Sequence, residues 1–374
     1  MFFQYHTGIA DLLHVPALPT LPSVTGPAKY IADYDVLLGQ FGVGIFFIIS
    51  GFVIPFSIAS GGMLGFLKRR AFRIFPTYAA GFSLVVFSIW VITRYRGTDF
   101  GYSVPHILSH YGILTRGILG YSRIDGISWT LEIELVFYLI VALLGTRLAF
   151  SGPRTLITAA LIVSGASVAS IFSLRAGFYN TVGNTGVQFW ASLLLIIGVS
   201  YHLLFIGCLT RLEFSVVNSA ITALVIAVWL CSDRTVYNWQ LVGGYILAIL
   251  IFSIGFRTRA RIYSNIILSH LADISYPLYV VHALTGYAVM YWAIDNDASS
   301  YEAVGLALLI SYLLSVLIHI SVEQPFMEKS GKSRKIKGQQ PSKIRQTPYL
   351  REQEEIVGAG RPADPGKLQD GQRL

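Results

Sequence analysis

Long apolar runs restrict the fold of this chain more than any other feature of its sequence. A helix needs about 20 apolar residues to cross a bilayer core of roughly 30 Å, and irregular backbone does not face lipid. The runs are continuous, whereas a membrane β-barrel shows alternating segments of about ten residues. The sequence therefore predicts an all-α integral membrane protein. Nine complete spans are expected, at about residues 41–58, 74–93, 129–150, 155–174, 187–209, 214–232, 241–256, 273–294 and 302–321.

The amino-acid composition agrees with this fold class. Hydrophobic residues fill 54% of the 374 positions and charged residues only 13%, about half of the roughly 25% usual in soluble domains. A soluble domain of this size needs more charge to cover its surface. The composition therefore argues against a soluble enzyme, a disordered chain and a nucleic-acid-binding module, and no nucleic-acid partner is expected.

The basic residues set the expected orientation. Of the net charge of +8, residues 328–374 contribute most, with 11 Lys/Arg against 6 Asp/Glu. Lys and Arg of short loops stay on the cytoplasmic side. With the basic loop at 68–73 placed there, and the tail counted only as far as Lys337, 15 bases lie on that side against 7 on the other. We expect a multi-pass protein of the inner (plasma) membrane with a cytoplasmic C-terminus. Residues 1–327 would form the membrane domain, 328–374 a disordered basic tail, and 7–40 and 94–128 extracytoplasmic segments.

Two acidic residues lie at the start of the expected span that begins at Trp129. Glu132 and Glu134 are two positions apart, so on a helix they point to different faces, one toward water and one toward the bundle. Ionisable groups within spans are costly and usually functional. The alternative is that both carboxylates stabilise the N-terminal turn of the helix through its dipole.

A glycine pattern marks the first complete span. Gly44 and Gly51 recur seven residues apart, with Ser50 beside the second glycine. Small residues at this spacing allow two helices to approach closely. Packing alone explains the pattern.

A basic cluster precedes the second span. Four cations within six residues can hold an anionic cosubstrate through charge-assisted hydrogen bonds. The alternative is simple anchoring of the loop at the cytoplasmic surface, which the cluster alone favours. Its members are Lys68, Arg69, Arg70 and Arg73.

Two further ionisable residues lie near the C-terminal spans. His282 lies nine residues after Asp273, near the middle of the span expected at 273–294. A histidine in a span is either an interhelical hydrogen-bonding group or a functional one. Glu323 follows the last span, close to the cytoplasmic basic loops, where a structural ion pair explains it.

Taken in order, these segments resemble the acyltransferase 3 family of multi-pass membrane acyltransferases. The resemblance covers about residues 1–327 and implies about ten transmembrane helices, a cytoplasmic acyl-CoA donor, and an acceptor, commonly a carbohydrate hydroxyl, on the outer side. Five motifs with matching span spacing carry it. They are Gly-Val-x-x-Phe-Phe-x-x-Ser-Gly-Phe at 42–52, Arg-Arg-x-x-Arg-Ile-x-Pro-x-Tyr at 69–78, Trp-Thr-Leu-x-x-Glu-x-x-Phe-Tyr at 129–138, Ser-Tyr-x-Leu-Tyr-x-x-His at 275–282, and Glu-x-Pro-Phe at 323–326.

The chain departs from the family pattern at two places. Members usually carry Asp at the position of Gly44, so any role of that carboxylate is lost here or taken by another group. The family's first helix holds an Arg and a His ten residues apart; Tyr5-His6 fits the His end, and the Arg would precede Met1. We therefore expect residues up to His6 to be the end of a truncated first helix, and a start codon assigned too far downstream is the simplest explanation.

The resemblance also implies roles for individual residues. His6 is the main catalytic candidate, as a base for the acceptor hydroxyl or as a nucleophile that takes the acyl group itself, and Glu134 and His282 complete the catalytic set. The expected cosubstrate is acyl-CoA, with acetyl as the expected acyl group, and its phosphates would bind Lys68, Arg69, Arg70 and Arg73. No metal is expected, because no His, Cys or Asp residues lie at ligand spacing. The substrate path would be lined by Ser50, Trp129, Tyr138, Ser275 and Tyr279.

Two other functions remain open from the sequence. A proton-coupled transporter or flippase would use Glu134, Asp273 and His282 as a relay, although the two halves of the chain show no paired broken helices. A catalytically inactive family member is the third reading. The last 45 residues, 330–374, are too few for the extra hydrolase-like domain that some members carry, so the protein would act alone or with a separate extracytoplasmic transferase partner, on a carbohydrate or glycolipid acceptor.

Overall fold

A computed structural model describes residues 13–16, 34–58, 62–144, 152–175, 189–232, 238–259 and 266–329. All regular secondary structure in these ranges is helical, which confirms the all-α prediction. His6 and the predicted tail at 330–374 lie outside the described residues. The elements are α3 (Asp35–Ile58), α4 (Gly62–Arg96), α5 (Val104–Tyr111), α6 (Leu114–Ile118), α7 (Ser128–Leu144), α8 (Pro153–Arg175), the 3₁₀ turn η2 (Phe189–Ala191), α10 (Ser192–Phe205), α11 (Arg211–Cys231), α12 (Trp239–Thr258), α13 (Ile266–Val281), α14 (Leu284–Asp295), α15 (Ser300–Ile318), the π-helical turn η4 (His319–Glu323) and α16 (Gln324–Met327).

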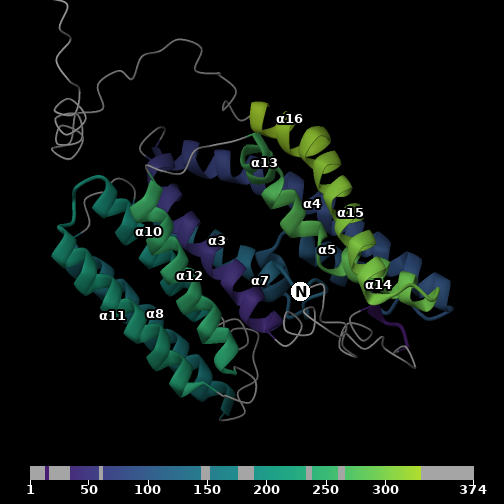
Figure 1. The fold of residues 1–374 in the computed structure, drawn as a ribbon, viewed down its shortest axis with the longest axis horizontal. Helices are drawn as coiled ribbons and strands as arrows, with labels where there is room; N and C mark the ends of the chain where they lie inside the picture. Colours follow the sequence, from purple (N-terminus) through teal and green to yellow (C-terminus); the bar gives the residue numbers. More distant parts are fainter. Residues whose placement is uncertain are drawn as a thin grey trace, which may run out of the picture.

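The helices form a bundle with α3 in its interior (Figure 1). On one side α3 packs against α10 and α12, and on another it meets α7. Figure 1 shows α8 and α11 paired at one edge of the bundle and α14 and α15 at the opposite edge. The outward faces of these edge helices carry exposed leucine, isoleucine and phenylalanine side chains. Such faces suit lipid rather than water, so the architecture agrees with an integral membrane protein.

Close glycine contacts bring α3 against its two main neighbours. A Cβ atom added at Gly51 would lie 2.0 Å from the Leu195 carbonyl oxygen and 3.0 Å from the Gly198 Cα on α10. A Cβ at Gly44 would lie 2.7 Å from the Ala248 Cβ on α12. The predicted packing role of this glycine pair is therefore confirmed, since only glycine permits both approaches.

We expected the basic segment at 68–73 to be a loop. In the structure it is part of α4. This helix is 35 residues long, which corresponds to about 52 Å, well over the thickness of a bilayer core. Phe66 and Arg70, one turn apart on α4, both face the Tyr138 ring of α7. Their packing against α7 extends the helix through the charged stretch.

Six helices in the described ranges are long and apolar enough to cross a membrane, and η2–α10 and α13 are shorter apolar helices. Each of the nine expected spans overlaps a helix in these ranges, but the bounds of two of them need correction. The span expected at 273–294 is two helices, since α13 ends at Val281 and α14 begins at Leu284. The last span also continues beyond its expected end, because η4 and α16 extend α15 and place Glu323 within the helix rather than after it.

The expected extracytoplasmic segment at 94–128 folds back along α4. It contains the short helices α5 and α6, and α5 packs against α4. The His110 ring of α5 stacks on Phe82, with 5.1 Å between ring centroids, and the Tyr111 hydroxyl lies 2.8 Å from that of Ser83. These α4 residues lie in the middle of the predicted span, so the segment covers part of α4 instead of projecting from its end.

Candidate functional site

The Glu134 side chain of α7 lies in the bundle interior and is almost fully buried. Its Oε1 atom accepts a hydrogen bond from the Ser50 hydroxyl of α3 at 3.2 Å and another from the Tyr138 hydroxyl one turn along α7. A carboxylate removed from water needs such donors, because burial without them is costly. The three residues therefore form one polar centre at the α3–α7 contact.

Arg70 connects this centre to the basic end of α4. Its guanidinium lies 5.1 Å from the centre of the Tyr138 ring and is itself buried. Arg70 and Arg73 are also close enough to Glu134 to interact with it electrostatically. The contact with the Tyr138 ring thus holds the positive charge of Arg70 near the buried Glu134 carboxylate.

Ser57, at the end of α3, positions two of the predicted phosphate-binding arginines. The Arg69 guanidinium donates to the Ser57 carbonyl and the Arg70 guanidinium to the Ser57 hydroxyl, each at 2.7 Å. The sequence analysis assigned no role to Ser57. The only sequence feature that could have indicated this role is a hydroxyl side chain 12 residues before Arg69 and 13 before Arg70.

The other two cations of the cluster differ in environment. Lys68 is exposed, with its ammonium 5.8 Å from the Phe72 ring centre. Arg73 lies 4.0 Å from the buried Glu323 carboxylate, which also contacts His319 Nδ1 at 2.8 Å. The expected structural ion pair of Glu323 is therefore confirmed. Lys68 is the member of the cluster most accessible to a soluble ligand.

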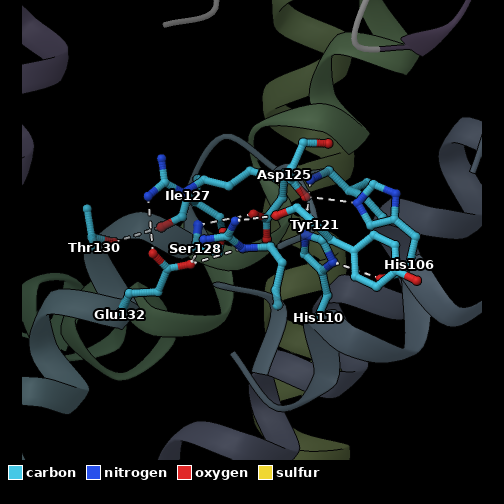
Figure 2. A network of polar contacts seen from close by, with 12 residues as sticks. His106, His110, Tyr121, Asp125, Ile127, Ser128, Thr130 and Glu132 are labelled. Atoms are coloured by element: carbon cyan, nitrogen blue, oxygen red, sulfur yellow. Dashed lines mark hydrogen bonds and ion pairs between the residues drawn. The ribbon is translucent and has the colours of Figure 1, made fainter. Parts of the chain in front are cut away.

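Glu132 belongs to a second polar centre, drawn in Figure 2. Its carboxylate receives Arg116 on Oε1 and Arg123 on Oε2, the latter at 3.1 Å, and the Arg116 guanidinium also donates to the Tyr121 carbonyl at 2.7 Å. As predicted, Glu132 and Glu134 point to different faces. Both are buried, however, so the expectation that one faces water is wrong. Arg116 of α6 and Arg123, which lies between α6 and α7, thus cover Glu132 with two cations.

Asp125 ties the same segment to α4 and to the start of α7. Its Oδ2 accepts from the Tyr78 hydroxyl at 3.1 Å, and its Oδ1 accepts from the Ser128 backbone N–H at 3.1 Å. An acceptor at this position satisfies one of the free N–H groups of the helix N-terminus. Two arginines and two carboxylates are buried or half-buried here, so the charges of the centre balance.

His110 of α5 is held in one neutral tautomer. Its Nε2 accepts from the Ile124 backbone N–H at 3.0 Å, so the ring proton sits on Nδ1, which donates to the His106 carbonyl at 3.1 Å (Figure 2). A proton on Nε2 would break the contact with Ile124. Burial also lowers the pKa of His110 below its usual 6.5. The His110 ring therefore acts as a structural link between α5 and the segment before α7.

Tyr279 of α13 lies next to the start of α7. Its hydroxyl and that of Thr130 are 2.6 Å apart, and its ring stacks on Phe46 of α3 with 5.8 Å between centroids. Thr130 precedes Glu132 by two residues and Glu134 by four. Because Thr130 and Glu134 are one turn apart, a line of polar groups runs from Tyr279 along one buried side of α7 to Glu134, and it can support proton transfer or hydrogen bonding to a hydroxylated substrate.

His282 stands where α13 ends and α14 begins. Its Nδ1 lies 2.8 Å from the Tyr279 carbonyl and 3.1 Å from the Leu278 carbonyl. A side chain that donates to the last carbonyls of a helix stabilises its C-terminus. His282 lies beside Tyr279, with 5.8 Å between the ring centroids, so the structure brings it near the Tyr279 end of the polar line.

The remaining predicted path residues are placed unevenly. Trp129 is half-buried, and its ring lies 6.2 Å from that of Phe47. Ser275 is exposed on α13, and its hydroxyl donates to the Ala272 carbonyl of its own helix at 2.7 Å. Ser50, Tyr138 and Tyr279 lie in the interior near α7, whereas Ser275 does not join them.

The family resemblance expects an aspartate at the position of Gly44, where α3 packs directly against α12. Gly44 faces Ala248 of α12 at a distance that leaves no room for a Cβ atom. A carboxylate at this point would clash with α12 in the observed packing. The buried carboxylate that contacts α3 is Glu134 of α7, which accepts from Ser50.

The sequence model of the acyltransferase 3 family, described as an acyltransferase domain, matches residues 5–320. Nodulation protein 10 of Rhizobium leguminosarum bv. viciae is 31% identical over 134 residues, which cover 30% of this chain and 34% of that protein. The match therefore spans about a third of the relative's length. No solved structure matches the chain significantly.

Proposed function

The chain belongs to the acyltransferase 3 family, and from this premise we propose that it moves an acyl group, acetyl in the first instance, from cytoplasmic acyl-CoA to a hydroxyl of an extracytoplasmic or lipid-linked carbohydrate. The family membership makes the protein a multi-pass membrane acyltransferase. The donor, the acyl group and the acceptor are parts of the proposal. We also propose the plasma membrane as its site and a cytoplasmic C-terminus, with residues 1–327 as the acyltransferase domain and 328–374 as its tail.

One observation carries the proposal: buried contacts run from the basic cluster of α4 to the Glu134 carboxylate. Arg70 packs on Tyr138, and Tyr138 donates to Glu134, which Ser50 also contacts. An anionic donor bound at the basic end would thereby lie next to a chain of groups that can exchange protons. Simple anchoring of basic residues at the membrane surface does not account for an arginine buried against α7.

The proposed reaction is an attack of the acceptor oxygen on the thioester carbonyl. The carbon–sulfur bond breaks, an acyl carbon–oxygen bond forms, and the acceptor proton leaves with CoA thiol as the other product. His6 takes that proton as a base, or first accepts the acyl group as a nucleophile. Glu134 and His282 line the path, and the basic residues at 68–73 hold the CoA phosphates, since Arg and Lys both bind phosphate oxygens well.

The test is acyl transfer in inside-out membrane vesicles from cells that express the full chain. Radiolabelled acetyl-CoA is added, and label is measured in extracted carbohydrate and glycolipid. We expect label with the unaltered protein and little with His6→Ala or Glu134→Ala. Full activity of both variants would refute the proposed site. Acetyl-CoA that stays intact in vesicles with the unaltered protein would favour a transporter or an inactive protein. Mass spectrometry of cell-surface glycans would then identify the acceptor.

The proposed orientation has its own test. Reporter fusions at the C-terminus distinguish the two sides of the membrane, because green fluorescent protein folds in the cytoplasm and alkaline phosphatase is active only outside it. We expect a fluorescent fusion and an inactive phosphatase. The opposite pattern would reverse the orientation and place the basic cluster of α4 away from the CoA pool.

A further inference from the structure

A cavity of about 830 Å³ lies between α10, α11 and α12, away from the α3–α7 contact that holds Glu134. Its size falls within the range of small-molecule sites. α11 packs closely against α8 and α10 but makes few contacts with α12, which leaves this space at the end of the helices near Arg211 and Arg257. None of the family-like motifs lines it.

The inner wall of the cavity is aromatic. Tyr201 of α10 meets Phe214 of α11 with 4.7 Å between ring centroids and Phe256 of α12 with 4.9 Å. Such a wall suits hydrocarbon. Next to it, the outward faces of α11 and α12 expose Leu212 and Ile254, which would contact lipid. The cavity therefore adjoins the acyl chains of the bilayer.

The mouth of the cavity is basic. Arg211 begins α11, and Arg257 and Arg259 lie at the end of α12. Within the described part of the chain, no Asp or Glu carboxylate lies within 4.0 Å of Arg211 or Arg257. Arg259 packs against the Phe256 ring, 4.3 Å from its centre. By the positive-inside assignment these residues face the cytoplasm, where they would meet the head groups of the inner leaflet.

The cavity also presents polar groups below its mouth. The Asn218 amide nitrogen donates to the Ser200 hydroxyl at 2.8 Å and to the Phe214 carbonyl at 3.0 Å, while its buried Oδ1 has no hydrogen-bond partner among the described residues. The Tyr201 and Ser253 hydroxyls are 2.5 Å apart.

We propose that this cavity binds a phosphate-headed lipid of the cytoplasmic leaflet, with the phosphate on Arg211 and Arg257 and the acyl chains along the aromatic wall. Arginine matches phosphate oxygens with paired donors, and a basic pocket between membrane helices on the cytoplasmic side is suited to an anionic head group. The site is separate from the catalytic proposal, because α3 directs Ser50 toward Glu134 and Phe52 toward Phe256.

The experiment is native mass spectrometry of the full chain released from nanodiscs of phosphatidylcholine mixed with phosphatidylglycerol. We expect the protein to retain phosphatidylglycerol. The double variant Arg211→Gln/Arg257→Gln should bind it more weakly by about tenfold for each arginine removed, the usual effect of losing a hydrogen bond to a charged group. Ser215→Trp keeps both arginines but fills the cavity, and it should also lose the lipid.

Arg154→Gln is the matched control, because Arg154 is an exposed arginine at the start of α8 and does not line the cavity. Retention of phosphatidylglycerol by both cavity variants at the level of this control would overturn the proposal. Displacement of the lipid by acetyl-CoA or by inorganic phosphate would also overturn it, by assigning the arginines to a soluble phosphate compound. Loss of the lipid by the two cavity variants, with an unchanged rate of CoA release from acetyl-CoA, would uphold the lipid site independently of the proposed enzyme activity.

Discussion

The Ser50 hydroxyl of α3 donates a hydrogen bond to the Glu134 carboxylate of α7 at 3.2 Å, across 84 positions of sequence. The contact joins the helix that packs against α10 and α12 to the helix that follows the α5–α6 segment. Between two apolar helices, a polar contact of this kind fixes both rotation and depth, because an unpaired carboxylate is strongly disfavoured in the membrane.

Replacement of Glu134 should remove activity more than stability. Glu134→Gln keeps the size of the side chain and can still accept from Ser50 and Tyr138, but it cannot carry a proton as a carboxylate does. We expect acyl transfer to fall by about 10²–10⁴, the usual contribution of a general acid or base, with a small change in thermal unfolding temperature. Rates with labelled acetyl-CoA and unfolding in detergent test both parts.

Tyr138→Phe is the companion variant for that experiment. It removes one donor to Glu134 and keeps the ring on which Arg70 packs. A partial loss of activity is expected. Activity of Glu134→Gln equal to that of the unaltered protein would show that the carboxylate serves packing alone.

Glu132, two residues earlier, should behave in the opposite way. Glu132→Gln leaves Arg116 and Arg123 facing a neutral amide inside the protein. Breaking a buried ion pair costs about 3–5 kcal/mol, so the unfolding temperature should drop and the activity of the remaining folded protein should change little. A variant as stable as the parent, followed by circular dichroism during heating, would contradict this role.

The sequence predicted the helical class and most helix positions, because continuous apolar runs have few other solutions in a bilayer. It failed at 68–73, where four cations suggested a loop. Phe66 and Arg70, one turn apart, both pack on Tyr138, and this long-range contact favours helix over loop. The break at His282 was also missed, since 273–294 was read as one span despite His282 within it, and the break depends on side-chain contacts with the end of α13.

The candidate site was predictable in part. The motif residues Ser50, Glu134 and Tyr138 meet in the structure, although their roles in catalysis and in the substrate path stay predictions. The Arg116–Glu132 pair was not anticipated, because it depends on how the α5–α6 segment returns to the start of α7. His6 lies outside the described residues, so its proposed role stays a prediction as well.

Two cations of α4 should affect donor use differently. Lys68 is exposed, so Lys68→Gln should raise the KM for acetyl-CoA by up to about tenfold, the effect of one lost charge-assisted contact, without a large change in kcat. Arg70→Gln should lower kcat as well, because the Arg70 guanidinium packs on Tyr138 next to Glu134. Steady-state kinetics separates the two effects, and equal kinetic constants for both variants and the parent would exclude the cluster from donor binding.

The protein should lose stability as the solution becomes acidic, because of the buried His110. Burial lowers the pKa of His110 below 6.5, so below that pH the unfolded chain binds a proton that the folded chain does not. The free energy of unfolding therefore decreases as the pH falls through 6.5 and levels off below the folded pKa. Each unit of pKa difference contributes up to about 1.4 kcal/mol.

His110→Gln should flatten this dependence. Unfolding temperatures measured from about pH 8 to pH 5, the range in which histidine titrates, should fall less for the variant than for the parent. His270→Gln changes an exposed histidine of α13 and should leave the slope unaltered. Parallel curves for His110→Gln and the parent would assign the acid sensitivity to other groups.

The contact between α3 and α10 should tolerate no side chain at Gly51. A Cβ atom there would lie 2.0 Å from the Leu195 backbone oxygen, and a backbone atom cannot rotate away as a side chain can. We expect Gly51→Ala to push the two helices apart and to cost at least the roughly 1–3 kcal/mol typical of overpacking, with a matching loss of monodisperse protein on size-exclusion chromatography. Gly42→Ala, on the same helix with no heavy atom within 4 Å of the added Cβ, is the control. Equal unfolding temperatures for the two variants would mean that α3 and α10 are not packed as closely as the structure has them.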